Sequence, residues 1–381
     1  MSSSEAKKSL LIISDTPLIE SNNRLFIFEP TLNEIESISH LFRKIVWVTY
    51  LRNDPKMDLY KCVSPPNIVI IPFRHSRGGA SLLKKIKILC TLPAQYFFIW
   101  KELRKHDVIH SRGPSVPAII GIIHSFFDRK RIYWHKYAGN WAEVNPPIAY
   151  RLQRWLLKTL DKNNIRITIN GNWTNLHSRF MSWENPCISK ELLGKSRLNG
   201  NYKFNGGKLK ICFVGTLDVN KGAVRLAKAL NGEEFKNHIE GVWFIGEGTQ
   251  KEELKNLAKS SAVPFNICGA MGRNKIFTEI YAACHLLILP SKSEGFPKVV
   301  AEAAAHFCIP VVTKMSSLDQ YIENEINGFF LQDSTTESIR CAFRSIINRK
   351  EDLPLIANSS FLLAEKFTYT RFCERVRSEI I

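Results

Sequence analysis

Two carboxylates flank a loop-to-helix junction in the second half of the chain. Residues 287–312 read LILPSKSEGFPKVVAEAAAHFCIPVV and carry Glu294 and Glu302 with seven residues between them. The pattern predicts a strand ending at Pro290, a loop, and a helix with Pro297 near its first turn, where a missing N–H costs nothing. The open amides of such a turn suit a phosphate. Carboxylates on both sides suit a ligand with hydroxyl groups at both ends and a diphosphate between them, as in a nucleotide sugar.

Glu302 also has an ordinary interpretation, as a solvated helix residue paired with Lys298 four positions earlier. The neighbouring residues, from Val299 to Ala305, are otherwise apolar and leave almost no polar helix face. This composition favours a ligand role for the Glu294 and Glu302 pair.

Two further strand-to-helix loops could meet the same ligand. In ICFVGTLDVNKGAVRLAKAL (211–230), Gly215 follows a buried strand and permits close backbone approach, while Lys221 precedes a helix where it could meet phosphate. The G-x-x-x-x-G-K-[ST] spacing of a Walker A loop is absent. In FIGEGTQKEEL (244–254), Gly246 and Gly248 could serve either a turn or a ligand.

These motifs, in this order, resemble the donor domain of retaining GT-B glycosyltransferases. The resemblance is to the large sucrose-synthase-like family, of the type that acts in bacterial cell-surface polysaccharide assembly. It covers about residues 205–335 and includes SEGFPKVVAEA and IPVVT. The first half resembles that family mainly in outline.

The resemblance implies a role for each matching residue. Glu302 would hold the nucleotide ribose and Glu294 would meet the donor sugar as a catalytic group. The diphosphate would be held by Lys221 and by the amides of three residues: Gly295, Phe296 and Lys298. Thr216 stands where the family usually has Arg, so one diphosphate cation is missing, and Arg273 or Lys298 is the candidate replacement.

The first half offers candidate catalytic and acceptor-binding residues. RIYWHKYAGNWAE (131–143) predicts a strand ending at His135 and Lys136, followed by a loop with Asn140. Residues at the carboxyl ends of parallel strands are where α/β sheets bind ligands, although a lone histidine is as often structural. Arg112 follows another predicted strand in the same way and could reach an acceptor phosphate.

Positive charge is concentrated in the same half. The chain has a formal net charge of +18, and residues 1–200 contain 30 basic and 15 acidic residues. Residues 74–106 carry eight basic residues and one acidic residue among many aromatic and aliphatic ones. This stretch predicts either an interfacial helix on an anionic membrane or a core-packed helix pair with solvated lysines. Nucleic acid is not expected as a partner, because no recognised binding motif accompanies the charge.

Apolar runs alternate with helical stretches along all 381 residues, which predicts an α/β fold with two doubly wound, Rossmann-like domains facing across a cleft. Strands are expected at Ser9–Ser14, Lys44–Thr49, Asn67–Ile71, Asp107–His110, Arg131–Lys136, Ile165–Ile169, Leu209–Val214, Gly241–Ile245, Phe265–Ile267, Leu286–Leu289 and Ile309–Thr313. We expect an acceptor domain at 1–190, a donor domain at 191–355, and a C-terminal helix at 356–381 that packs back on the first domain.

Nine scattered cysteines without a C-x-x-C pair indicate reduced thiols, and the N-terminus lacks a signal-peptide core. We therefore expect a cytoplasmic protein, peripheral on the inner face of the cell membrane.

The sequence thus predicts a hexosyltransferase that moves a sugar from a UDP- or GDP-linked donor to a lipid-linked glycan, with no cofactor. No D-x-D triplet is present to hold a metal, so a metal-independent reaction is expected. Alternatives are a non-catalytic nucleotide-sugar-binding subunit and a sugar-nucleotide epimerase on the same fold.

Overall fold

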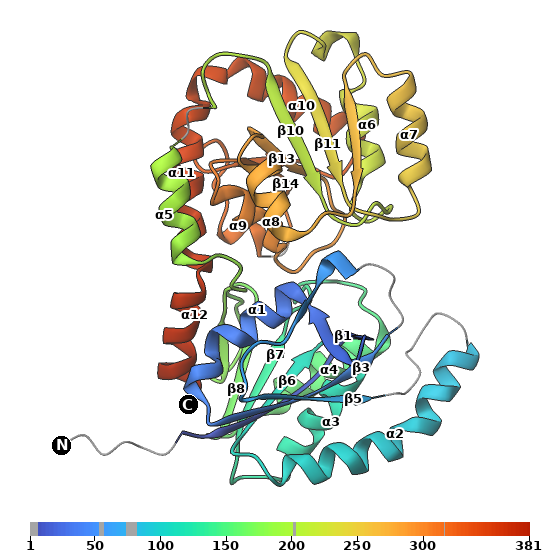
Figure 1. Cartoon of the computed structure of the whole chain (residues 1–381), viewed down its shortest axis with the longest axis vertical. Coiled ribbons are helices and arrows are strands. Elements are labelled where there is room, and N and C mark those ends of the chain that lie inside the picture. The colour runs from blue at the N-terminus through green and yellow to red at the C-terminus, as the bar shows by residue number, and fades with distance from the viewer. Residues whose placement is uncertain (1–6, 53–56, 74–81, 201–202, 316) are drawn as a thin grey trace, which may run out of the picture. The chain divides into compact units, whose positions relative to one another are not determined.

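The computed structural model describes residues 7–52, 57–73, 82–200, 203–315 and 317–381, without the side chains of 58, 82–92 and 199. The chain divides into two compact units (Figure 1): one holds Met1–Trp183 with Phe372–Ile381, and the other holds Glu184–Arg371. The second unit thus begins before the expected boundary at 190 and extends past 355.

The first unit is built on a mainly parallel sheet. Its parallel strands lie in the order β5-β3-β1-β6-β7-β8-β9, and β2 and β4 extend it antiparallel from the second half of β1. The strands are β1 (Ser9–Ser21), β2 (Arg24–Phe28), β3 (Lys44–Leu51), β4 (Tyr60–Cys62), β5 (Ile68–Phe73), β6 (Val108–Gly113), β7 (Ile132–Tyr137), β8 (Ile165–Ile169) and β9 (Phe180–Ser182).

Helices cover both faces of this sheet because successive strand residues alternate between two apolar cores. Leu11 and Ile13 of β1 pack under α2 (Leu82–Leu103), α3 (Val116–Ser125) and α4 (Ile148–Thr159). Leu10 and Ile12 pack on the other face, with α1 (Glu29–Ile38) and with α12 (Tyr369–Arg375) and its continuation to Ile380.

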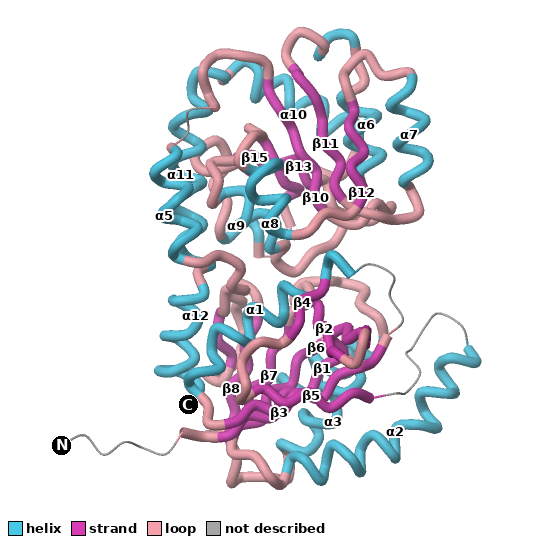
Figure 2. The backbone as a smooth tube through the Cα atoms, viewed as in Figure 1, coloured by secondary structure: helices cyan, strands magenta, loops and turns pink. Residues whose placement is uncertain are grey.

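The second unit has a fully parallel sheet in the order β12-β11-β10-β13-β14-β15. Figure 2 shows helices around these strands. The strands are β10 (Leu209–Val214), β11 (Ile239–Ile245), β12 (Phe265–Gly269), β13 (Leu286–Leu289), β14 (Ile309–Thr313) and β15 (Phe329–Leu331). The helices are α5 (Lys190–Asn199), α6 (Ala223–Leu230), α7 (Lys251–Lys259), α8 (Arg273–Lys275) with a π turn to Tyr281, α9 (Lys298–Ala304), α10 (Thr336–Asn348) and α11 (Leu353–Ala364).

Both units are therefore Rossmann-like, which confirms the predicted fold class. The residues that follow the expected domain boundary at 190 form α5. The tail, expected as one C-terminal helix, is divided: α11 packs in the second unit through Phe361 and Leu363, whereas Phe372 and Val376 pack in the first.

Candidate functional site

Lys221 and Glu294, which are 73 residues apart in sequence, meet at the carboxyl edge of the second unit's sheet. The Lys221 ammonium forms an ion pair with Glu294, and the Ser291 hydroxyl donates to the same carboxylate at 3.0 Å. The two side chains retain 23% and 12% exposure, so the pair is accessible at its edge. The structure therefore brings together the cation and the carboxylate for which the family resemblance implies contacts with the diphosphate and the sugar.

The backbone around this pair is fixed by contacts between two loops. Asn220 accepts from the Lys292 amide at 2.8 Å through its carbonyl and donates to the Ser293 carbonyl at 3.1 Å. Gly222 has φ +83°, and a Cβ there would lie 2.6 Å from the Pro290 carbonyl oxygen. Only glycine allows the loop after β10 to approach the end of β13 this closely.

The glycines after β11 also have a backbone role. A Cβ at Gly246 would lie 1.8 Å from the Gly215 oxygen, and one at Gly248 would lie 2.2 Å from the Leu217 oxygen. The Gly215 and Leu217 amides donate across this contact to Ile245 and Glu247, at 3.0 and 2.9 Å. Loop packing therefore requires both glycines, while their ligand roles, like that of Gly215, stay predictions.

Glu302 lies beside Arg273. It is 7% exposed, and the Arg273 Nε and Nη2 atoms lie 3.1 and 2.9 Å from its carboxylate. The guanidinium also donates to the Tyr369 hydroxyl at 2.9 Å and to the Cys187 carbonyl. Although burial acts in the opposite direction, the charge of Glu302 raises the pKa of Arg273 above its ordinary value. Arg273 was a candidate to replace the arginine that the family usually has after Gly215, but in the structure its charge is paired with Glu302. Lys298, the other candidate, is the first residue of α9.

The remaining predicted donor residues lie around the same edge. The Phe296 ring stacks on Phe367 with centroids 4.4 Å apart, so only its backbone is available to a ligand. Gly295 accepts from the Ser317 hydroxyl at 3.1 Å, and Thr216 is exposed in the loop after β10. Among the described residues, no cluster of histidine, cysteine or acidic side chains could hold a metal ion.

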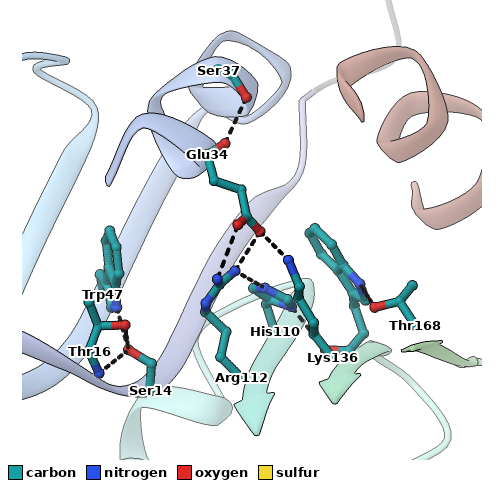
Figure 3. A network of polar contacts seen from close by, with 10 residues as sticks. Ser14, Thr16, Glu34, Ser37, Trp47, His110, Arg112, Lys136 and Thr168 are labelled. Carbon is teal, nitrogen blue, oxygen red and sulfur yellow. Dashed lines mark hydrogen bonds and ion pairs between the residues drawn. The ribbon is translucent and has the colours of Figure 1, made fainter. Parts of the chain in front are cut away.

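In the first unit, Arg112 and Lys136 converge on Glu34 (Figure 3). The Arg112 Nη1 and Nη2 atoms lie 2.7 and 3.2 Å from the two carboxylate oxygens, and the Lys136 Nζ lies 2.7 Å from the first. Glu34 is fully buried, and the side chains of Arg112 and Lys136 are 13% and 3% exposed. The cluster carries one more positive than negative charge and lies where β6 and β7 end.

His110 belongs to the same cluster. Its ring stacks on Trp134 with centroids 3.7 Å apart, and its Nε2 lies 3.3 Å from Arg112 Nη1. Burial, and then the charges of Arg112 and Lys136, hold the pKa of His110 well below its ordinary value. Its ring is therefore neutral near pH 7. His110 and Glu34 were not identified from the sequence. One signal for Glu34 was available: it lies four positions before the apolar Ile38, which places a carboxylate on an apolar face of the same helix.

The structure does not bring His135 and Lys136 together. They are adjacent in β7, and neighbouring strand side chains point to opposite faces of the sheet. His135 is 1% exposed, its Nε2 lies 3.2 Å from the Ser125 hydroxyl under α3, and burial lowers its pKa to about 3. This placement suits a neutral packing residue. Asn140 accepts from the Ala142 amide at 3.0 Å in the loop after β7.

The segment that contains these paired residues is similar to a known protein family. Residues 195–358 match the family of glycosyl transferases group 1. The matched stretch lies within the second unit and includes Lys221, Arg273, Glu294 and Glu302.

Relatives along more of the chain are also glycosyltransferases. An uncharacterized glycosyltransferase of Haemophilus influenzae is 25% identical over 318 residues, covering 80% of this chain and 86% of the relative. The sulfoquinovosyl transferase SQD2 of Arabidopsis thaliana is 21% identical over 301 residues, covering 72% of this chain and 56% of the relative.

Solved structures show the fold. Sucrose-phosphate synthase from Thermosynechococcus elongatus aligns with a TM-score of 0.70 and 14% identity, over 97% of each chain. HepE from Anabaena, in complex with UDP, aligns with a TM-score of 0.65 and 15% identity, over 97% of this chain and 98% of its own. The fold is GT-B, and together the comparisons support a glycosyltransferase.

Proposed function

We propose that the protein transfers a hexose from a UDP- or GDP-linked donor to a lipid-linked glycan, with retention of anomeric configuration. The observation that carries this proposal is the convergence of Lys221 with Glu294, and of Arg273 with Glu302, at one sheet edge inside the segment that matches the glycosyltransferase family. HepE was crystallised with UDP-glucose, which supports a UDP-linked sugar as the first donor to test.

The donor residues would act mainly through electrostatics. Negative charge develops on the nucleoside diphosphate as the sugar leaves, and a cation held in place stabilises that charge. Glu294 already orients the Lys221 side chain, so Lys221 would lose little conformational entropy when the donor binds. Glu302, fixed by Arg273, would accept hydrogen bonds from the ribose hydroxyl groups. In this scheme the positive charge comes from Lys221 and backbone amides, without a metal or cofactor.

The acceptor proposal rests on charge. The first half of the chain carries twice as many basic as acidic residues, and Arg112 and Lys136 lie at the ends of its central strands. An anionic diphosphate linking a glycan to a lipid would be attracted to such a unit. Together with the family resemblance, this charge supports the proposal that the protein acts in cell-surface polysaccharide synthesis, peripherally at the inner surface of the cell membrane. No helix within the described residues is long and apolar enough to cross a membrane.

The test is a turnover assay. Purified protein is incubated with UDP- and GDP-linked hexoses, with and without polyprenyl-diphosphate-linked glycans, and released nucleoside diphosphate is measured. Release that requires the lipid-linked glycan supports the proposal. Donor conversion without an acceptor would instead identify an epimerase, and nucleotide binding with no turnover under any condition would identify a non-catalytic subunit.

A further inference from the structure

An outward stripe on α4 is the strongest surface feature that the donor and acceptor clusters leave unexplained. Ile148, Leu152 and Trp155 are 77%, 44% and 60% exposed. Their spacing of four and three residues places them on one helix face. Gln153 and Leu157, on the opposite face, are buried against the rest of the first unit. These three side chains therefore present apolar surface to solvent instead of burying it in the core of that unit.

Positive charge lies within the same stripe. Arg151 and Lys158 are exposed, and the helix from Ile148 to Thr159 contains no acidic residue. Arg154, in contrast, turns inward and donates to the carbonyls of Trp141 and Glu143 at 2.6 and 2.9 Å. We refer to Ile148, Arg151, Leu152, Trp155 and Lys158 as the α4 stripe.

The neighbouring helices α2 and α3 and the residues that follow α3 also carry exposed aromatic and basic side chains. In the helix layer, α3 packs against both α2 and α4. Phe127 at the end of α3 is 84% exposed and is followed by exposed Arg129 and Lys130. On α2, Phe97 is 54% exposed, and the Lys101 ammonium lies 4.3 Å from its ring centroid. The predicted interfacial stretch 74–106 contributes this part of α2; residues 74–81 and the side chains of 82–92 lie outside the described structure.

Most acidic side chains of this layer are covered and paired with a basic residue. Glu102 pairs with Lys105 at 2.7 Å, and its side chain is 14% exposed. Asp128 pairs with Arg131 at 2.7 Å, and its side chain is 8% exposed. Asp161, two residues after α4, has a side chain that is 62% exposed and pairs with Arg179 at 3.2 Å. The exposed charge on α4 itself is positive.

We propose that the α4 stripe docks the protein on an anionic lipid surface. A helix face that combines exposed Trp, Leu and Ile with Lys and Arg is suited to the boundary between head groups and acyl chains. Trp is favoured at that boundary, and each nearby cation adds attraction to anionic head groups. If two copies of this chain met through their α4 stripes, the basic residues of one stripe would face those of the other, and α4 has no acidic residue to pair with them. An anionic lipid surface is therefore favoured over a second copy of this chain. This inference deepens the proposed function. It rests on the proposal that the acceptor is lipid-linked, because that acceptor gives the protein a reason to dock on a lipid surface.

The experiment measures sedimentation of the full chain with vesicles of phosphatidylcholine, alone or with about one-third phosphatidylglycerol. We expect binding only to the anionic vesicles, weakened when salt is raised from about 0.1 M to about 0.5 M. R151S/K158S should lower the partition coefficient by about 30-fold, as expected for losing two cations near an anionic surface. I148S/L152S/W155S should lower it by at least about tenfold, because the apolar contribution is lost.

Matched controls come from exposed residues of the second unit. K255S/K259S on α7 removes two exposed cations, and L198S/L355S/L362S removes three exposed leucines. Both should bind vesicles like the wild type. Equal binding by R151S/K158S and the wild type, equal binding to neutral vesicles, or a dimer that I148S/L152S/W155S dissociates would each overturn the proposal. UDP-induced thermal stabilisation, measured on the same variants, tests the donor site separately, so loss of docking is distinguished from loss of the proposed function.

Discussion

At the scale of single residues, the charged side chains of both units work in opposed pairs. Lys221 faces Glu294, Arg273 faces Glu302, and Glu34 is shared by two cations. Attraction to the opposite charge holds each long side chain in one position, and the charges of the partners largely cancel. A diphosphate entering the proposed donor site would therefore compete with Glu294 for Lys221 and would find the ammonium already oriented.

Glu34 provides a test of this pairing. Glu34→Ala leaves Arg112 and Lys136 without their carboxylate in a buried site, so the free energy of unfolding should fall by about 3 kcal/mol or more in urea denaturation. Glu253→Ala on α7 is the control. Its side chain is 46% exposed and that of its partner Lys228 is 51% exposed, so the expected loss is below about 1 kcal/mol. Similar losses for the two variants would show that the cluster does not hold the unit together.

The sequence identified four of these residues, Lys221, Arg273, Glu294 and Glu302, but not the ion pairs that they form with one another. Motif spacing places a residue on an element, whereas the pairing of Arg273 with Glu302 depends on how α8 packs beside α9. Glu34 was missed for the same reason, since its partners lie 78 and 102 residues away. His135 and Lys136 were grouped as neighbours in sequence, although the pleat of β7 separates their side chains.

At the scale of elements, two loops of the second unit touch through their backbones. The loop after β11 lies against the loop after β10, and glycine at 246 and 248 makes this contact possible. Most of the buried central strands were predictable because they are rich in apolar residues. Short edge strands such as β9 and β15 have only three residues each and lack that signal.

Gly246→Ala tests the contact between these loops. Its Cβ would fall 1.8 Å from the Gly215 oxygen in a backbone with φ +144°, so the loop must move. We expect the free energy of unfolding to fall by at least about 2 kcal/mol, measured by urea denaturation. Gly194→Ala in α5 meets nothing within 4 Å and should instead stabilise the protein by up to about 1 kcal/mol. A stable Gly246→Ala protein with unchanged donor binding would contradict the close contact.

At the scale of the whole molecule, buried histidines in both units make stability depend on pH. Burial lowers the pKa of His135 to about 3 and that of His306 to about 4. In the unfolded chain these rings bind a proton near pH 6.5. Above that pH neither state is protonated and the rings do not change stability, whereas the free energy of unfolding falls as the pH drops from 6.5 toward 4. Each histidine should contribute about 1.4 kcal/mol per pH unit in that window.

Urea unfolding between pH 7 and pH 5 measures this slope. We expect His135→Gln and His306→Gln to make the loss of stability on acidification shallower than in the wild type. Identical slopes in the wild type and both variants would mean that the two buried rings do not control acid stability.

The two halves differ in how much the sequence alone established. The second unit carries the motifs, the family match and most of the predicted donor residues. The first unit was predicted in outline and charge only, because its polar cluster joins residues from α1, β6 and β7 without a local motif.

The most direct test of the central claim is calorimetric titration of UDP and GDP into the full-length protein. The donor site predicts saturable binding of at least one of them, weakened at least about tenfold by Lys221→Met and by Glu302→Gln. Lys228→Met, which removes an exposed lysine of α6, should bind like the wild type. Absence of binding to either nucleotide, or full affinity in both site variants, would contradict the assignment of a nucleoside diphosphate sugar to this edge of the sheet.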